Sequence, residues 1–299
     1  MDWDKLKSFH AAAETGSLTA AGERLGISQS AVSRQIASLE EKLEATLFQR
    51  HARGLMLTEA GRILHRATAE MSSAARTAES ALQDTGETPH GELHVTAPVA
   101  FGSFWLAPRM HRFFQLYPRM RVKLSLDDRE YDLLTLEAEC AIRLWAADKA
   151  DLIQRKLTTV GTSLYASAAY LEEAGVPERP EDLDRHQIIT YGPADEHMKI
   201  VNWAQRIGRD DRNLREATLQ INNVNGMMRA VRDGGGIADL PDYMIMDSFN
   251  LKKVLPDHIG PTFDLFFIYP SDLRRSKRIS VFRDWLVSEI EASKTELRA

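Results

Sequence analysis

The stretch that most constrains this chain is residues 15–53, which read TGSLTAAGERLGISQSAVSRQIASLEEKLEATLFQRHAR. Ser17 or Thr19 can cap a short helix rich in small residues, and those small residues allow a neighbouring helix to approach closely. Gly26 then provides a turn, and Ser28 can cap a second helix. This succession predicts two short helices joined by a tight turn, a helix-turn-helix.

The second of these helices has two different faces. Its apolar face consists of Val32, Ile36 and Leu39. Its opposite, N-terminal face carries short polar side chains and one arginine: Gln29, Ser30, Ser33 and Arg34. A recognition helix needs this division, because one side packs on the preceding helices while the other reaches base edges and phosphates in the major groove. A solvated helix face has the same residue types, but the turn and the small-residue helix before it favour DNA recognition.

The segment after this helix, LFQRHARGLMLTEAG, alternates as a short hairpin does, with Gly54 at the turn. Arg50 and Arg53 would then stand on a wing beside the recognition helix, where they can reach a phosphate or a narrow minor groove. From residue 24 to residue 66 there are seven basic and four acidic residues, a local charge of +3 in a chain of net charge -5. The basic character is therefore local, which argues against a protein that coats nucleic acid with its whole surface.

Residues 58–83 predict one long helix, which Thr58 can cap and which Gly86 and Pro89 bring to an end. Small and apolar residues repeat along it with heptad spacing, and the central ones are Leu64, Ala67, Met71, Ala74 and Ala78. A narrow seam of alanines favours packing against an identical helix in a homodimer, although a helix packed on its own domain remains the alternative. A dimer would hold two recognition helices about one DNA turn (roughly 34 Å) or a multiple apart.

Composition excludes several classes of protein. The 299 residues suffice for two or three domains. No run of 18 apolar residues could cross a bilayer, and the N-terminus lacks the pattern of a signal peptide, so we expect a cytoplasmic protein without membrane contact. The single cysteine, Cys140, excludes an internal disulfide; its apolar neighbours favour a core thiol over a redox sensor.

From Gly91 onward, short β-like runs alternate with helices, which predicts an α/β region with mainly parallel sheets. The expected strands are Leu93–Ala97, Val122–Leu126, Cys140–Trp145, Gly161–Ser167, Gln187–Tyr191, Thr218–Asn222 and Phe263–Tyr269. Gly234–Gly236 is interpreted as a helix-to-strand connection, because no GxGxxG phosphate-binding pattern surrounds it.

The N-terminal motifs resemble those of LysR-type transcriptional regulators from about Met1 to Gly61. Four of them follow in order: SQSAVSRQI, LEEKL, LFQR and LTEAG. Weaker matches, among them GELHVTAP and GGGIADLPDY, extend the resemblance over essentially the whole chain.

The resemblance implies a sequence-specific regulator that binds double-stranded promoter DNA and responds to a small-molecule effector. Its DNA contacts would come from Ser17, Gln29, Ser30, Ser33, Arg34, Arg50 and Arg53. Assembly as a dimer of dimers and contact with RNA polymerase are further implications. The implied fold is a winged helix-turn-helix (residues 1–58), a dimerisation helix (59–89) and a two-lobed effector domain similar to type II periplasmic binding proteins (90–299). Lobe 1 would comprise about 91–162 and 267–299, and lobe 2 about 163–266, with crossings near Thr162 and Phe266.

Ligands of open α/β sheets bind at the carboxyl ends of strands and at helix N-termini. The candidate effector residues in such places are Thr96, Pro98, Val99, Phe101, Asp128, Arg129, Arg143, Trp145, Tyr191, Asn222 and Pro241. Thr96, Arg129 and Arg143 could hold a carboxylate, and the aromatic residues could supply apolar walls. The acidic residues nearby, Asp127, Asp128 and Glu139, leave the charge of the ligand open.

Catalysis and metal binding are not predicted. The chain has no GxSxG, HExxH or Walker motif, its nine histidines show no ligand spacing, and no cofactor is expected. A DNA-binding architectural protein that ignores small molecules remains a second alternative. The basic run Arg274–Arg278 is interpreted as a solvated face rather than a second nucleic-acid contact.

Overall fold

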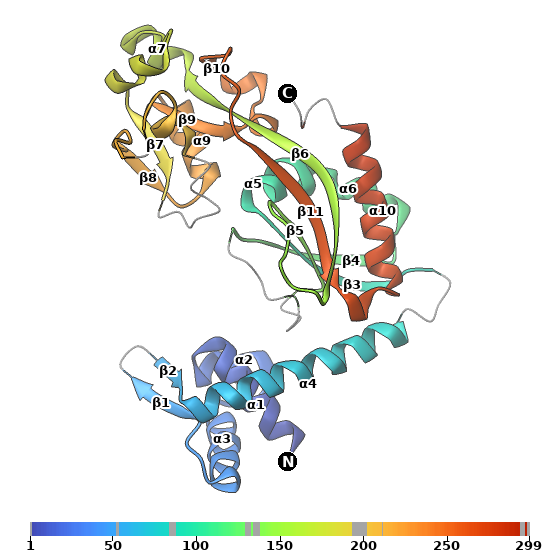
Figure 1. The fold of residues 1–299 in the computed structure, drawn as a ribbon. Coiled ribbons are helices and arrows are strands. Elements are labelled where there is room, and N and C mark those ends of the chain that lie inside the picture. Colours follow the sequence, from blue (N-terminus) through green and yellow to red (C-terminus); the bar gives the residue numbers. More distant parts are fainter. Residues whose placement is uncertain are drawn as a thin grey trace. The chain divides into compact units, whose positions relative to one another are not determined.

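The computed structural model describes residues 2–51, 54–83, 88–128, 133, 138–192, 202–210, 212–293 and 297, with the main chain alone at 50, 51, 54, 73, 76, 77 and 79–83. Two compact units are present, one within Met1–Leu82 and the other beginning at Gln83. Figure 1 shows the helices and strands of each. No described helix is both long and apolar enough to cross a membrane.

Three helices form the body of the first unit: α1 (Trp3–Thr15), α2 (Leu18–Leu25) and α3 (Gln29–Leu43). Gly16 and Gly26 end α1 and α2 with φ of +63° and +68°, a left-handed conformation that glycine adopts without strain. The apolar faces of the three helices enclose a core in which Phe9, Val32 and Leu39 are fully buried. The predicted helix-turn-helix is confirmed.

A hairpin and a long helix follow. Strands β1 (Phe48–His51) and β2 (Gly54–Leu57) pair antiparallel, and the two residues that join them, Ala52 and Arg53, lie outside the described residues. Thr58 caps helix α4 (Glu59–Gln83), since its hydroxyl oxygen accepts the N–H of Gly61 at 3.0 Å. Thr58 also donates to the carbonyl oxygen of Thr46 at 2.6 Å, which fixes the start of α4 against the chain that enters the hairpin.

Lobe 1 of the second unit is built on three parallel strands, β3 (Gly91–Ala97), β4 (Met120–Leu126) and β5 (Cys140–Arg143), with β3 in the middle. One helical run, α5 (Val99–Phe101), a π-helical turn (Gly102–Leu106) and α6 (Ala107–Leu116), leads from β3 to β4. Helix α10 (Lys277–Ala292) lies beside α6 (Figure 1), and Phe113 packs edge-on against Phe282 of α10.

Two long strands belong to both lobes. Strand β6 (Leu152–Ser167) carries the chain into lobe 2, and β11 (Thr262–Pro270) carries it back. The two pair antiparallel from Leu152 to Gly161, and β11 also pairs with β5. From Thr162 onward β6 pairs instead with β9 (Ile237–Pro241) and β10 (Leu251–Val254). The strand order is β4-β3-β5-β11-β6-β9-β7-β8, with β10 also on β6 (Figure 1).

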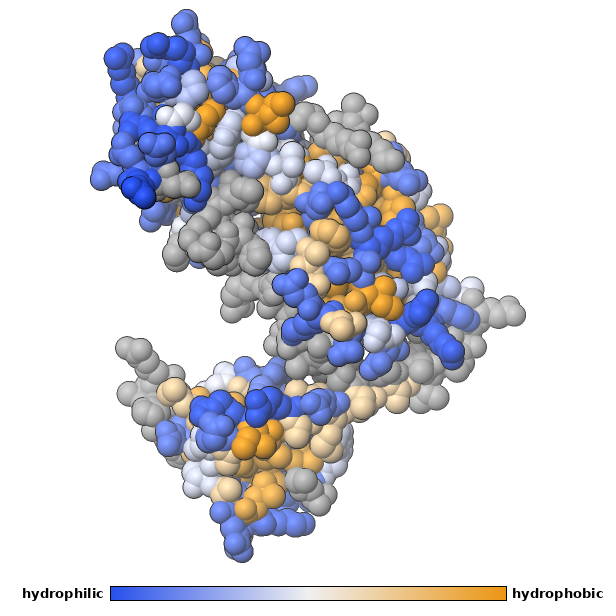
Figure 2. All heavy atoms as spheres, in the orientation of Figure 1, coloured by the Kyte–Doolittle hydropathy of each residue, from blue (hydrophilic) through white to orange (hydrophobic). Residues whose placement is uncertain are grey.

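Lobe 2 completes the sheet with β7 (Ile188–Tyr191) and β8 (Leu219–Ile221). Its α-helices are α7 (Ala168–Ala174), α8 (Trp203–Arg206) and α9 (Val224–Arg232). Short 3-10 helices occur at Pro180–Arg185, Asp242–Met244, Asp247–Phe249 and, after β11, Ser271–Leu273. Gly234–Gly236 connects α9 to β9, as predicted, and hydrophilic side chains gather over the end of the lobe that carries α7, β7 and β8 (Figure 2).

The structure corrects three expectations about the strands. The strand predicted to begin at Gly161 begins at Leu152. The sequence did not show its first half, because exposed polar residues there hide the strand pattern. Strand β10 occupies a segment for which the sequence predicts no strand, and β9, implied only by the helix-to-strand connection at Gly234–Gly236, is given its bounds by the structure. Pairing is parallel only within each lobe; every pair that involves β6 or β11 is antiparallel, because these strands run between the lobes in opposite directions.

Arg278, from the basic run, and Glu139, from the predicted acidic surroundings of the ligand, are also placed differently. Arg278 is 4% exposed, and its Nη2 donates to Glu139 Oε1 at 2.7 Å. The other oxygen of Glu139 accepts the N–H of His94. Arg278 is therefore part of the core of lobe 1 and not of a solvated face, whereas its neighbours Arg274 and Arg275 are exposed. The core-thiol interpretation of Cys140 is confirmed, since burial raises the pKa of its thiol well above the usual range.

Candidate nucleic-acid interface and ligand cleft

The turn between α2 and α3 fixes how the second helix projects. The N–H of Ile27 donates to the carbonyl oxygen of Gly22 at 3.0 Å. A Cβ atom on Gly22 would lie 2.7 Å from the carbonyl oxygen of Ile27, so only glycine allows this close approach. Ser28 caps α3 by accepting the N–H of Ala31 at 3.2 Å. These contacts fix the direction in which α3 leaves the turn relative to α2.

Two hydrogen bonds hold the middle of α3 against α1. Lys5 Nζ donates to Ser38 Oγ at 2.7 Å, and the hydroxyl of Ser8 donates to the side-chain oxygen of Gln35. Ser8 is 1% exposed. These pairs were not predicted, because they join residues 27 and 33 positions apart; the only sequence signal is a serine on an otherwise apolar helix face.

The predicted polar face of α3 is accessible. Gln29, Ser30 and Arg34 are exposed, Ser33 is half-buried, and the apolar face of the same helix lies in the core. Ser30 also lies 3.0 Å from the hydroxyl of Ser28. Ser17 is half-buried, and its hydroxyl oxygen caps α2 by accepting the N–H of Ala20. Three donor-bearing side chains therefore face solvent at the end of α3 that points away from the core.

The hairpin is tied to α3 by Glu40. Glu40 Oε1 accepts the N–H of Leu47 at 2.7 Å and that of Phe48 at 3.2 Å, which sets where β1 begins. Arg50 lies in β1 opposite Leu55 of β2, with only its main chain described. Arg53 lies outside the described residues. The start of the hairpin is therefore anchored to α3, while the position of both guanidinium groups stays a prediction.

The predicted seam of α4 is divided between two environments. Leu64 is half-buried and packs against the helix-turn-helix core of its own unit. Ala67, Met71, Ala74 and Ala78 are exposed, and a pale orange band of such side chains follows α4 in Figure 2. The side of α4 that faces α1 carries instead the buried Thr68 and Ala69. Four small or apolar side chains are thus left on the surface at seam spacing.

A cleft lies between the two lobes of the second unit. Its main cavity, of about 30 Å³, is lined by residues of both lobes and of the crossing strands: Pro98, Ala100, Asp128, Leu144, Val160, Thr162, Val224, Met227, Asp239, Pro241, Tyr243 and Phe263. A second cavity of about 10 Å³ adjoins it and is lined by Thr96, Pro98, Asp127, Asp128, Ile142, Arg143, Leu144 and Trp145. Both are far smaller than the several hundred Å³ that a small-molecule pocket usually offers.

Asp239 is the most unusual group in this cleft. It is 3% exposed, and neither carboxylate oxygen has a hydrogen bond of normal geometry with a described residue. Burial raises its pKa well above the usual range, although the Thr162 hydroxyl and the Trp203 backbone N–H lie near enough to lower it slightly. The Thr162 hydroxyl donates elsewhere, to the carbonyl oxygen of Pro261. The cleft therefore contains a buried acid that has donors nearby but no well-formed hydrogen bond to a described residue.

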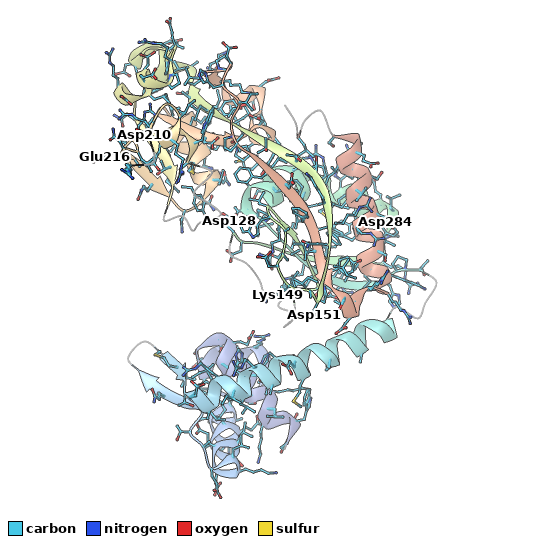
Figure 3. All side chains as sticks on the ribbon, in the orientation of Figure 1. Asp128, Lys149, Asp151, Asp210, Glu216 and Asp284 are labelled. Atoms are coloured by element: carbon cyan, nitrogen blue, oxygen red, sulfur yellow. The ribbon has the colours of Figure 1, made fainter. Side chains whose placement is uncertain are left out.

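Asp128 joins the two lobes across the cleft (Figure 3). Its Oδ1 accepts the N–H of Val99 at the start of α5, at 3.0 Å, and its Oδ2 accepts the hydroxyl of Tyr191 from lobe 2 at 3.4 Å. Burial raises the pKa of Asp128, and the two hydrogen bonds offset this only in part. The helix N-terminus expected to attract an anion is thus already occupied by a carboxylate of the protein itself.

Only some of the predicted cleft residues line the two cavities. Those that line the cavities are Thr96, Pro98, Asp128, Arg143, Trp145 and Pro241, while Val99 and Tyr191 reach the cleft through Asp128. Phe101 is fully buried and stacked on Trp105, Asn222 is exposed, and neither lines either cavity, so their roles in effector binding stay predictions. Arg129 lies outside the described residues. Thr162 was predicted only as a crossing point, and its place in the cavity lining was missed because it depends on strand pairing that the sequence does not reveal.

Comparison with known proteins gives the same division of the chain. Residues 3–62 match the family model described as bacterial regulatory helix-turn-helix protein, lysR family, and residues 86–291 match the LysR substrate binding domain. An HTH-type transcriptional regulator of Xanthomonas campestris is 30% identical over 93% of this chain and 82% of its own length. CrgA, an HTH-type transcriptional regulator of Neisseria meningitidis, is 28% identical over 96% of each chain.

Solved structures show the same fold. The structure of Neisseria CrgA, a LysR-type transcriptional regulator, has a TM-score of 0.61 at 27% identity and covers 97% of this chain and 99% of its own. The full-length structure of the Vibrio cholerae virulence activator AphB has a TM-score of 0.65 at 24% identity, with 96% and 99% covered. The predicted two-lobed effector domain behind a helix-turn-helix is thereby confirmed. The chain belongs to the LysR family of DNA-binding bacterial transcriptional regulators.

Proposed function

We propose that this regulator reads a two-part promoter site as a homodimer and that a small molecule bearing a cationic or hydrogen-bond-donating group controls it from the cleft. The recognition helix is α3, with Gln29, Ser30, Ser33 and Arg34 toward the bases and Ser17, Arg50 and Arg53 toward phosphates. The observation that carries the DNA-reading part is the exposed donor-rich end of α3 on a helix whose other face is core. Arginine and short polar side chains are the residue types that read base edges in the major groove.

The DNA-contact assignment predicts unequal effects of single substitutions. Arg34→Ala or Ser33→Ala should weaken binding to the specific site by about 1 to 3 kcal/mol, because each removes hydrogen bonds to bases. Arg53→Ala should weaken specific and non-specific DNA more evenly and reduce the salt dependence, because it removes a phosphate contact. Fluorescence anisotropy with both kinds of duplex at several salt concentrations measures this. Arg121→Ala, which removes one exposed arginine from lobe 1, is the control, and unchanged affinity in all three variants would refute the assignment.

Dimerisation is proposed to use the exposed part of the α4 seam, Ala67, Met71, Ala74 and Ala78, while Leu64 supports the helix from its own core. Small side chains allow two helices to approach closely, and the packing would remove their apolar surface from water. A dimer of dimers and contact with RNA polymerase are proposed on the family resemblance alone.

The effector class follows from the charges that line the cleft. The acidic residues that line the two cavities are Asp127, Asp128 and Asp239. Arg143 is the only basic residue among the described residues that line them. A carboxylate ligand would find only Arg143 to pair with and would disfavour ionisation of the acids, whereas an ammonium group would pair with Asp239 and favour its ionised form. Because the cavities are far smaller than a typical small-molecule pocket, the effector would bind when the lobes move apart, which breaks the hydrogen bond between Asp128 and Tyr191.

Asp239→Asn tests this effector class. The free protein should become more stable by about 0.5 to 2 kcal/mol, because a buried acid is replaced by a neutral group of the same shape. The rise in melting temperature caused by small amines should disappear. A thermal-shift screen of amines and carboxylates matched in size measures both effects, with Asp210→Asn on the surface of lobe 2 as the control (Figure 3). Stabilisation by carboxylates, or an amine response retained in Asp239→Asn, would contradict the proposal.

A further inference from the structure

His10, Glu14 and His65 form a cluster where α1 packs on α4, within the first unit. One nitrogen of each histidine and one oxygen of Glu14 all lie within 4.8 Å of one another. His65 Nε2 is 3.2 Å from Glu14 Oε1, and the rings of His10 and His65 stack with centroids 5.4 Å apart. His10 and Glu14 are one helical turn apart on α1, so both side chains point to the same side of that helix. Long-range packing brings His65 to them, which is why spacing along the sequence gave no sign of the cluster.

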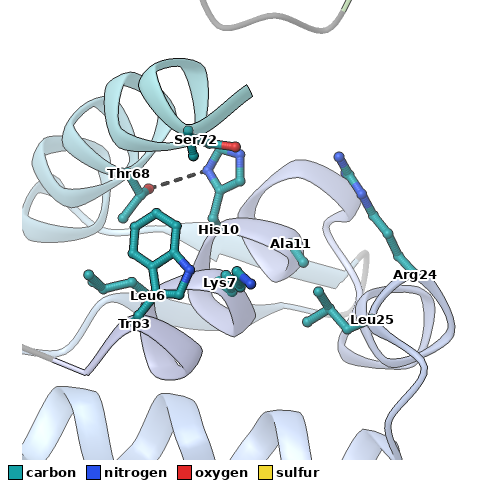
Figure 4. A pocket seen from close by; sticks show the side chains of 10 residues that line it. Trp3, Leu6, Lys7, His10, Ala11, Arg24, Leu25, Thr68 and Ser72 are labelled. Carbon is teal, nitrogen blue, oxygen red and sulfur yellow. Dashed lines mark hydrogen bonds between the residues drawn. The ribbon is translucent and has the colours of Figure 1, made fainter. Parts of the chain in front are cut away.

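Thr68 determines which nitrogen of His10 carries the proton. The Thr68 hydroxyl, in a residue that is 3% exposed, donates to the carbonyl oxygen of His65 at 3.0 Å. Toward His10 Nδ1, 3.3 Å away (dashed line in Figure 4), the same oxygen then acts as the acceptor. The proton of neutral His10 thus lies on Nδ1, which puts the lone pair of the ring on Nε2. A hydrogen bond of this kind orients the histidine ligands of many metal sites.

We propose that His10, Glu14 and His65 bind a first-row divalent metal ion such as Zn²⁺. Two imidazoles and one carboxylate are a donor set that suits Zn²⁺, Co²⁺ or Ni²⁺, whereas Mg²⁺ and Ca²⁺ prefer oxygen ligands alone. Ligands about 2.0 to 2.1 Å from a tetrahedral ion lie about 3.3 Å apart. The separation of 3.2 Å between His65 and Glu14 already matches this value. His10 completes the set by a small rotation of its ring.

The surroundings of the cluster leave one oxygen of Glu14 directed to the histidines and leave space beside them. The second oxygen of Glu14, Oε2, lies 3.8 Å from Arg24 Nη1, so Oε1 is the oxygen directed to the metal. A cavity of about 310 Å³, with His10, Arg24 and Thr68 in its lining, adjoins the cluster (Figure 4). It has room for the water that would fill the fourth coordination position. The ion would join α1 to α4 and thereby fix the helix-turn-helix on the helix to which we assign dimerisation.

The experiment is a titration of untagged, full-length, chelator-treated protein with Co²⁺, followed by visible absorption, and with Zn²⁺, followed by melting temperature. We expect one ion per chain, the absorption bands of four-coordinate Co²⁺, and an increase in melting temperature of a few degrees, about 3 °C or more. His10→Ala and His65→Ala should abolish the absorption bands. Glu14→Gln should weaken binding at least about tenfold, and Thr68→Val about 10- to 100-fold. His111→Ala, an exposed histidine of lobe 1, is the matched control and should bind as the unaltered protein does.

Three results would overturn the proposal. They are no saturable Co²⁺ binding by the unaltered protein, binding that persists in His10→Ala and His65→Ala, and equal loss in His111→Ala. Far-UV circular dichroism shows whether each variant is folded. If either histidine variant fails to fold, Glu14→Gln decides the question, because it replaces a carboxylate at the protein surface by an amide of the same shape. An unchanged affinity in Glu14→Gln then rejects the site.

Discussion

The double substitution Ala74→Glu and Ala78→Glu should convert the regulator to a monomer and reduce its affinity for the two-part promoter site by about 100-fold or more. Both alanines are exposed on α4, so the unpaired chain tolerates the larger side chains. In a dimer built on the seam, four carboxylates would instead be buried against each other at close range, which costs far more than the packing supplies. Once the dimer is lost, each monomer binds its half-site alone. The gain in affinity from linked binding, typically about 10²- to 10⁴-fold, then disappears.

Sedimentation velocity and gel shifts, performed on the same samples, measure this effect. Added negative charge weakens DNA binding by itself, so the control must carry the same charge change. Ala174→Glu with Val176→Glu adds two carboxylates to exposed positions at the end of α7 in lobe 2. The control should remain dimeric with nearly unchanged affinity. A dimer that persists in the α4 variant at low micromolar concentration would remove the seam from this role.

The second large effect concerns the buried ion pair of lobe 1. Glu139→Ala should lower the free energy of unfolding of the second unit by about 3 kcal/mol, because it leaves the guanidinium of Arg278 in the core without its carboxylate partner. The His94 N–H loses its acceptor as well. The loss should be smaller in the double variant Glu139→Gln, Arg278→Met, which removes both charges together.

Urea unfolding followed by tryptophan fluorescence monitors this unit, since Trp105 and Trp285 are buried in lobe 1. The transition of the second unit must be fitted separately, because a chain with two units need not unfold in one step. Arg275→Ala removes an exposed arginine from the same basic run and should change the free energy of unfolding by no more than about 0.5 kcal/mol. If Glu139→Ala changes the free energy of unfolding no more than this control does, the ion pair contributes little to stability.

The first unit was predictable because its signals are local. Ser17, Gly26, Ser28 and Thr58 each act on backbone groups within a few residues of themselves, so caps and turns are readable from the sequence alone. Helix α4 was predictable for the same reason, although only the structure shows that Leu64 of the proposed seam faces its own core.

What the sequence did not reveal depends on partners far away along the chain. Arg278 has the appearance of a surface arginine until β5 and α10 bring Glu139, 139 residues earlier, to its guanidinium. Asp239 looks like part of a turn, yet the pairing of β9 with β6 buries it. Strand β6 was recognised only over its second half, because its first half is polar at the surface and its partners come from residues 262–270. Such contacts follow from the topology as a whole and not from any short pattern.

The position of β11 has a consequence for the order in which this protein matures on the ribosome. In the sheet of lobe 1, β11 lies between β5 and β6, yet it is synthesised after all the other strands. Until it arrives, the edges of β5 and β6 that pair with β11 in the folded protein lack this partner. The nascent protein therefore carries two open strand edges throughout the synthesis of lobe 2, the interval in which wrong pairing or capture by a chaperone has most time to occur.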